Sequence, residues 1–174
     1  GGFPEPYNFQ SGAGAIYTSG KLNSITPQYS LDSSKIINGN IETNLAYLTR
    51  LRVKNGVLSD NLQRLVNISI ATDGNKAVIL RFYKNPTLIG NNTQGDFPNT
   101  FLLNPDSTIL VDTFSTSFTG GNQIFSLTLG KVDSQLLTFG QEQFVLNTNE
   151  TLLITAFSTQ TSEVSISLSI VEVV

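Results

Sequence analysis

The sequence predicts an all-β protein, in which an eight-stranded, jelly-roll-like β-sandwich over residues 45–174 follows an extended N-terminal arm over residues 1–44. Short apolar runs with period-two alternation recur from residue 46 onward, and turn signals separate them roughly every 8–15 residues. No helical period of about 3.6 residues persists over three turns. Eight strands in two sheets are typical of a jelly roll, and an immunoglobulin-like sandwich is the alternative.

The arm differs from the rest of the chain because glycine and proline interrupt it repeatedly. Aromatic side chains nevertheless recur there, and each can bury a large area at a small entropy cost. We therefore predict that the arm docks on a neighbouring subunit, and a loose linker is the alternative. The candidate assembly residues are Phe3, Tyr7, Phe9, Tyr17 and Tyr29. Because the chain starts at Gly1 instead of methionine, we expect a processed product or a fragment.

The first part of the predicted sandwich contains three β signals. Residues 45–53 form a strand or a short helix, which the turn at residues 54–56 ends. Two apolar, β-branched runs follow at residues 65–71 and 76–83. The Asp73-Gly74 pair between them favours a hairpin turn with positive φ, so we predict that the two runs form a hairpin.

Alternation assigns faces to the later strands. Val78, Leu80 and Phe82 share one face of their strand, which ends before Pro86 because proline cannot donate to the ladder. Further strands are predicted at residues 107–117, 124–129, 144–146, 151–158 and 163–173. The last is the clearest, because four apolar residues alternate with a solvated face. The apolar residues are Val164, Ile166, Leu168 and Ile170, and the solvated ones are Glu163, Ser165, Ser167 and Ser169.

Composition excludes several classes of function. Only 13% of the residues are charged and the formal net charge is -3, so duplex nucleic acid is not an expected partner. No apolar run is long enough for a membrane-spanning helix. Histidine and cysteine are absent, which excludes the Ser-His-Asp and Cys-His catalytic arrangements and the usual zinc ligands. We therefore expect a protein that is not an enzyme and that uses no cofactor or metal.

We expect the scattered charged residues to support the fold and not to form a catalytic site. Most carboxylates lie in or beside predicted loops, as solvated turn or cap residues. Asp112 is the one acid inside an apolar strand, and we predict that it is exposed or pairs with Arg81. Arg50, Arg52 and Lys54 alternate along one segment, which indicates a solvated strand face or, alternatively, a contact with an acidic neighbour.

Residues 80–172 resemble a family of phage and viral virion-surface proteins that carry a compact C-terminal jelly roll. The landmarks are Arg81-Phe82-Tyr83-Lys84-Asn85-Pro86-Thr87-Leu88, Asp106-Ser107-Thr108, Ser117-Phe118-Thr119-Gly120-Gly121, Leu152-Leu153-Ile154-Thr155-Ala156 and Val164-Ser165-Ile166-Ser167-Leu168. Many members end in a tryptophan-acid pair, whereas this chain has Ile170-Val171-Glu172 close to its last residue and lacks the aromatic residue.

The resemblance implies a virion structural protein without catalytic residues: a capsid decoration protein, a head fibre or a capsid subunit on the virion surface. It also implies a homo-oligomer, preferably a trimer, whose N-terminal arm contacts other virion proteins. Two alternatives remain. One is an extracellular filament or surface-layer subunit on the cell surface that assembles by strand addition. The other is a carbohydrate-binding module, for which a host-surface glycan would be the ligand.

Overall fold

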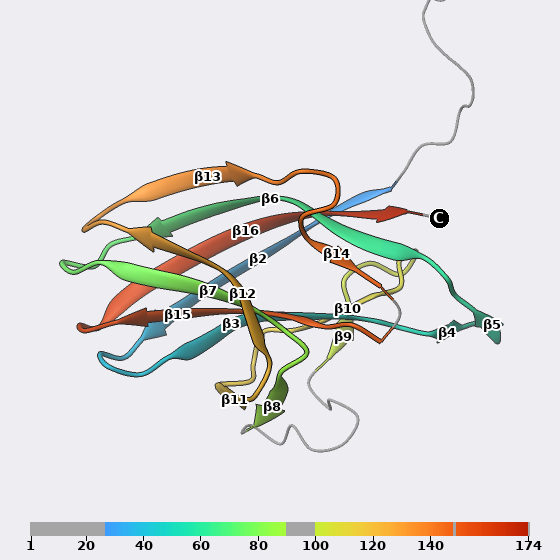
Figure 1. Ribbon diagram of the computed structural model, residues 1–174, viewed down its shortest axis with the longest axis horizontal. Coiled ribbons are helices and arrows are strands. Elements are labelled where there is room, and N and C mark those ends of the chain that lie inside the picture. Colours follow the sequence, from blue (N-terminus) through green and yellow to red (C-terminus); the bar gives the residue numbers. More distant parts are fainter. Residues whose placement is uncertain (1–26, 90–99, 148, 174) are drawn as a thin grey trace, which may run out of the picture.

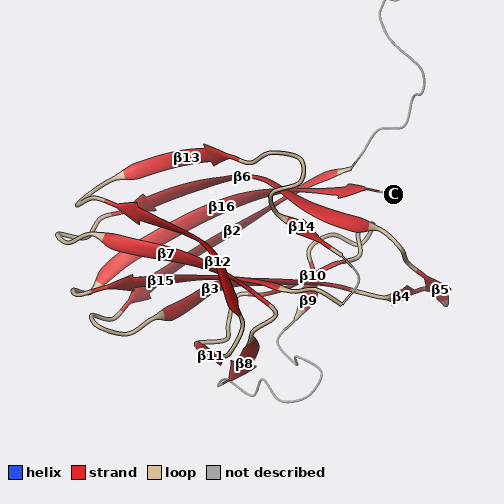
Figure 2. Ribbon diagram, viewed as in Figure 1, coloured by secondary structure: helices blue, strands red, loops and turns tan. Residues whose placement is uncertain are grey.

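The computed structural model describes residues 27–89, 100–147 and 149–173. Within these residues every regular element is a β-strand, as Figure 2 shows, so the predicted all-β fold is confirmed. The strands form two antiparallel sheets that pack face to face, and two short strand pairs lie outside them. Figure 1 shows the two sheets as stacked layers.

The first sheet is called here the β16 sheet, after one of its central strands. Its strand order is β13 (Ser134–Thr138), β6 (Leu62–Thr72), β16 (Ser162–Val173) and β2 (Gln28–Ile37). The short strand β14 (Val145–Leu146) also pairs with β6. Because β16 pairs with β6 on one side and β2 on the other along most of its length, it organises this layer.

The second sheet is called the β15 sheet. Its strand order is β12 (Asn122–Leu129), β7 (Val78–Lys84), β15 (Leu152–Ser158), β3 (Thr43–Arg50), β10 (Ile109–Asp112) and β9 (Phe101–Leu102). The two separate pairs are β8 (Thr87–Ile89) with β11 (Ser117–Thr119), and β4 (Val53–Lys54) with β5 (Val57–Leu58).

The order of the eight long strands is that of a jelly roll. Along the chain, β2, β3, β6 and β7 alternate between the sheets, and so do β12 with β13 and β15 with β16. One sheet therefore reads β2-β16-β6-β13 and the other β3-β15-β7-β12. This arrangement of two interleaved Greek keys confirms the predicted jelly-roll sandwich.

The core lies between the sheets and consists of side chains that alternate inward along each strand. Val78, Leu80 and Phe82 of β7 are fully buried, as their shared face predicts. Phe82 lies at the centre of an aromatic cluster, with its ring 5.4 Å from that of Phe125 and 5.3 Å from that of Phe144. Full burial of one such apolar side chain contributes about 1.5–3 kcal/mol.

The sandwich begins earlier than the predicted boundary at residue 45. Residues 28–37 belong to the predicted arm, yet they form the edge strand β2. Its pattern is hard to read because Ser33 and Lys35 occupy inward positions. Ser33 Oγ donates to the carbonyl of Leu45 at 2.9 Å, and Lys35 Nζ donates to the carbonyl of Asn44 at 2.7 Å. These hydrogen bonds satisfy polar groups that would otherwise oppose burial.

The predicted hairpin at Asp73-Gly74 is wrong. Strand β6 lies in the β16 sheet and β7 in the β15 sheet, so the turn between them connects the two layers. Gly74 does not have a positive φ. Glycine is needed at this position because there is no room for a side chain: a Cβ at Gly74 would lie 2.1 Å from Ser162 Oγ. The predicted turn at Gly120 and Gly121 is present, and both residues have positive φ.

Other strands differ in length from the prediction. The run at residues 107–117 forms only the four-residue strand β10, because the chain turns at Asp112. Strand β13 was not predicted, and its outward Leu136 is 68% exposed. Residues 151–158 and 163–173 form β15 and β16 as predicted, but in different sheets.

We expect Gly74→Ala to lower the free energy of unfolding by about 1–3 kcal/mol, because the new methyl group clashes with Ser162. Urea denaturation measures the loss, and adding Ser162→Gly should recover part of it. Gly140→Ala is the control, since no atom lies within 4 Å of its Cβ position. Equal losses at Gly74 and Gly140 would contradict the steric explanation.

Candidate functional site

Only one of the five predicted assembly residues lies in the described part of the chain. Tyr29 is in β2 opposite Ile170, where it is half-buried and packs against the core. Burial, followed by the charges of Glu172 and Asp106, raises the pKa of Tyr29. Tyr29 therefore contributes to the sandwich itself. The other four residues, Phe3, Tyr7, Phe9 and Tyr17, lie outside the described residues.

The start of β2 and the end of β16 lie side by side at one end of the sandwich (Figure 1). Gln28 is opposite Val171, and the N–H of Glu172 donates to the carbonyl of Pro27 at 3.1 Å. The chain before Pro27 is therefore joined to the domain at this end. A segment that links this domain to another protein would start here.

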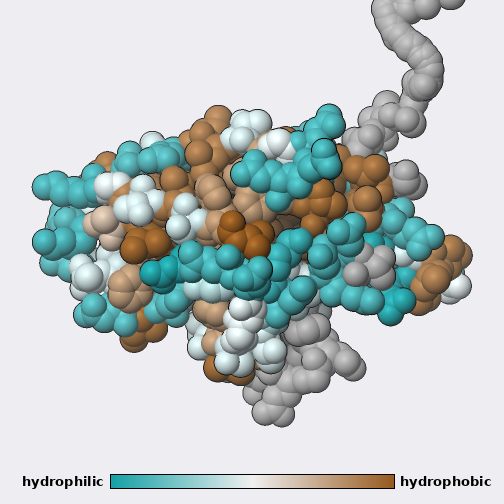
Figure 3. Space-filling view, viewed as in Figure 1, coloured by the Kyte–Doolittle hydropathy of each residue, from teal (hydrophilic) through white to brown (hydrophobic). Residues whose placement is uncertain are grey.

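The outward face of β16 changes from polar to apolar residues at the same end. Ser165, Ser167 and Ser169 face outward along most of the strand, but Val171 and Val173 occupy the last two outward positions. A groove of about 590 Å³ lies over these valines, and we call it the valine groove. It is lined by Gln28, Leu62, Arg64, Gln141, Glu142, Val145, Val171 and Val173. Figure 3 shows apolar surface over this end of the domain.

A short apolar hairpin, β4–β5, projects from the body of the domain and lies at the far right of Figures 1 and 3. Val53, Val57 and Leu58 are each more than half exposed on it. The base of the hairpin is fixed, because Lys54 Nζ donates to the carbonyls of Pro105 and Ser107. Exposed apolar groups in a held position are typical of contact surfaces.

The residues of the predicted basic stretch do not share one solvated face. Arg50 is 6% exposed and donates from Nη2 to the carbonyl of Ser59 at 2.7 Å. Lys54 is engaged at the hairpin base, so only Arg52 is exposed to solvent. The stretch therefore serves mainly to anchor the β4–β5 hairpin.

Asp112 is neither exposed nor paired with Arg81, in contrast to the prediction. It is 2% exposed and caps the turn after β10, where it accepts from Ser115 Oγ at 2.6 Å and from the N–H of Phe114 at 2.8 Å. An aspartate that binds its own following backbone stabilises a tight turn. This role explains a carboxylate at the end of an apolar strand.

Arg81 instead pairs with Glu42 on the outer face of the β15 sheet, with an Nη1–Oε1 distance of 3.2 Å. Tyr83 Oη and Thr155 Oγ1 both donate to Glu42 Oε2, at 2.9 and 2.6 Å. Burial, followed by the bond to Glu42, raises the pKa of Tyr83 to about 12. The phenol therefore stays protonated near neutral pH and cannot act as a base there. Phe118 packs on its ring at a centroid distance of 4.6 Å.

Glu172 is the most deeply buried acid of the last strand and faces the interior beside the valine groove. It is 3% exposed and accepts from Thr108 Oγ1 at 2.5 Å, from the N–H of Thr108 at 3.2 Å and from Asn61 Nδ2 at 2.8 Å. These bonds tie the end of β16 to the chain before β10. The carboxylate therefore has a structural role.

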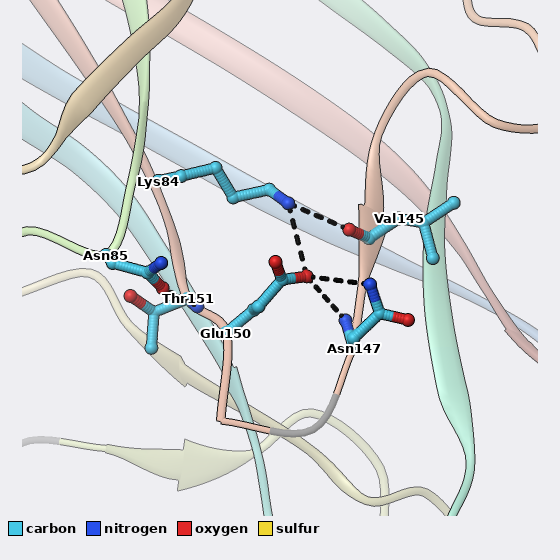
Figure 4. Close-up of polar contacts among 6 residues, drawn as sticks. All are labelled: Lys84, Asn85, Val145, Asn147, Glu150 and Thr151. Carbon is cyan, nitrogen blue, oxygen red and sulfur yellow. Dashed lines mark hydrogen bonds and ion pairs between the residues drawn. The ribbon is translucent and has the colours of Figure 1, made fainter.

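A polar latch joins the two sheets at the β14–β15 turn (Figure 4). Lys84 Nζ, from β7, donates to the carbonyl of Val145 in β14 at 3.0 Å and lies 3.3 Å from Glu150 Oε1. The same Glu150 oxygen accepts from the N–H of Asn147 at 2.8 Å. Burial raises the pKa of Glu150, but the bonds from Asn147 and Lys84 outweigh it and lower the pKa overall.

The acids that lie within the sheets or their latch thus bind protein donors. Among the described residues, no group of three or more acidic side chains could hold a metal ion. The same part of the chain contains no helix that is long and apolar enough to cross a lipid bilayer. The three tyrosines described, Tyr29, Tyr47 and Tyr83, are buried or half-buried, so none presents an exposed ring for a sugar to stack on.

We expect Glu172→Ala to lower the free energy of unfolding by about 3 kcal/mol or more, because it leaves the buried donors of Thr108 without an acceptor. Glu172→Gln keeps one acceptor oxygen and should cost less. The control is Glu163→Ala, an exposed acid of the same strand, with an expected change of about 0.5 kcal/mol. Chemical denaturation that gives similar values for Glu172→Ala and Glu163→Ala would disprove the structural role.

Comparison with known proteins gives neither a family model nor a curated protein that matches this chain. Among solved structures, it is similar to a chain in the crystal structure of the T13 IBDV viral particle. The two are 12% identical, and the match covers 93% of this chain and 44% of the viral one, so this chain spans less than half of that protein. The TM-score is 0.12, which does not establish a shared fold.

Proposed function

We propose that this chain is a non-enzymatic structural subunit of a virion, as a capsid decoration protein, a head fibre or a capsid subunit at the virion surface. The observation that supports this most is the jelly-roll strand order, with β2-β16-β6-β13 packed on β3-β15-β7-β12. The landmarks at residues 80–172 that resemble virion-surface jelly rolls lie on this framework, in strands β7, β15 and β16 and in the turn after β11.

The exposed apolar residues support an assembly role. The valine groove and the β4–β5 hairpin both adjoin the first residues of β6, at the end of the sandwich where β2 starts and β16 finishes. Charged side chains are few, so contacts between copies would depend mainly on apolar burial and on hydroxyl and amide groups. A stable contact of this kind buries about 1,200–2,000 Å² in total.

The titratable groups support a role without catalysis. Glu42, Asp112, Glu150 and Glu172 each accept hydrogen bonds from protein groups and thereby hold strands or turns in place. General acid–base catalysis instead needs a group that is free to exchange a proton with a substrate near the working pH. We therefore propose that the chain has no turnover of its own.

The two alternatives receive less support from the described residues. A filament subunit that assembles by strand addition would leave a position in its own sheet for a neighbour's strand, whereas all eight jelly-roll strands come from this one chain. A carbohydrate-binding module would present exposed aromatic rings, and the described tyrosines are buried or half-buried, so this role would depend on the exposed phenylalanines Phe101 and Phe114.

Native mass spectrometry of the full chain tests the proposed assembly. We expect a homo-oligomer, with a trimer as the favoured state, and we expect the chain in purified particles from its source by peptide mass mapping. The domain without residues 1–26 keeps every described strand and should remain folded by circular dichroism. A full chain that stays monomeric at high concentration and is absent from particles would contradict the proposal.

A further inference from the structure

We propose that the valine groove binds residues 1–26 of a second copy of this chain, called here the N-terminal segment, and that Glu5 of that segment pairs with Arg64. This inference rests on the proposed assembly function and names the surface that would carry it.

The floor of the groove is a continuous row across four strands. Val171 of β16 is opposite both Gln28 of β2 and Arg64 of β6, and Arg64 is opposite Val145 of β14. Two residues further along β16, Val173 is opposite Leu62 of β6 and also lines the groove. The row therefore combines four apolar side chains with the amide of Gln28 and the guanidinium group of Arg64.

Arg64 lacks a partner among the described residues. Its side chain is half-buried, and no hydrogen bond or ion pair joins it to another residue of the described chain. Glu142 also lines the groove, but it is exposed and does not come within salt-bridge distance of Arg64. A cation held beside valines is destabilised by the loss of water unless a carboxylate approaches it. The groove therefore suits a ligand that brings one carboxylate to Arg64 and apolar groups to the valines.

The N-terminal segment contains such a sequence. Its only acid is Glu5, which lies between two aromatic residues in Phe3-Pro4-Glu5-Pro6-Tyr7. The aromatic rings suit the valine floor, and the carboxylate suits Arg64 through a charge-assisted hydrogen bond. Proline restricts the backbone before binding, which lowers the entropy cost of docking.

The length of the segment allows it to reach another copy. The chain between Tyr7 and Pro27 spans up to roughly 65 Å when it is extended. The segment joins the domain beside Gln28, which itself lines the groove. If each copy gives its segment to the next copy and receives one in its own groove, the copies form a closed ring when the rotation from one copy to the next closes on itself.

Disulfide trapping tests the contact, because the chain contains no cysteine of its own. Full chains with Asn8→Cys, which keeps both aromatic rings, are mixed under mild oxidation with full chains that carry Gln141→Cys at the groove. We expect a disulfide between position 8 of one chain and position 141 of another. The control is Ser165→Cys, an exposed position on the same sheet away from the groove. Equal trapping at positions 141 and 165 would overturn the proposal.

The double variant Asn8→Cys/Gln141→Cys identifies which copy supplies the segment. A disulfide-linked ladder on a non-reducing gel supports exchange between copies. Disulfides found only within one chain would show that the segment folds back on its own domain, and this result would overturn the second-copy assignment.

Charge exchange tests the proposed ion pair. We expect Glu5→Arg or Arg64→Glu alone to reduce the trapped yield about tenfold, because each places like charges together. The combination Glu5→Arg/Arg64→Glu should restore the yield. Glu5 lies outside the described domain, so its variant tests the pair even if Arg64→Glu affects folding. Unchanged trapping in Glu5→Arg would overturn the ion pair.

The two proposals fail in different ways. If the chain forms oligomers and occurs in particles but no trapping occurs at position 141, the groove assignment is wrong and the virion function stands. If trapping succeeds but the chain is absent from purified particles, the virion function is wrong and the contact between copies stands.

Discussion

The structure depends on the burial of one row of side chains that β16 directs between the two sheets: Val164, Ile166, Leu168 and Ile170. Strands β6 and β2 pair with β16 on its two sides and present their own inward residues to the same core. Because the β15 sheet closes this core from the other side, the loss of the β16 row would expose both layers at once. The turns and the latch at Glu150 only set how the layers are connected.

The sequence predicts strand faces correctly where apolar and polar residues alternate strictly. The faces of β7 and of the middle of β16 are predicted correctly because the inward positions there, from Val78 to Phe82 and from Val164 to Ile170, are all apolar. The sequence predicts an arm where β2 lies, because the polar residues Ser33 and Lys35 occupy inward positions, and only the fold reveals that backbone carbonyls accept their hydrogen bonds. The Asp73-Gly74 turn shows a second limit, since local turn chemistry does not reveal which sheet each flanking strand joins.

The candidate site was not predictable from one stretch of sequence. The change from serine to valine along the outward face of β16 is visible at Val171 and Val173. The other groove residues, Arg64 and Val145, lie far away in the chain and join the valines only through the register of β6 and β14. The arm candidates share aromatic rings, but Tyr29 among them packs against the core of its own sandwich.

The inward row of β16 stabilises the fold, and the last outward residues of the same strand carry the proposed assembly contact. The most direct test is the native mass of the full chain with Val173→Ser, which extends the serine pattern of the outward face to a residue that is 40% exposed. We predict a dissociated oligomer whose subunits keep the circular dichroism spectrum of the folded sandwich. An oligomer of unchanged mass and strength would contradict the assignment of the valine groove to assembly.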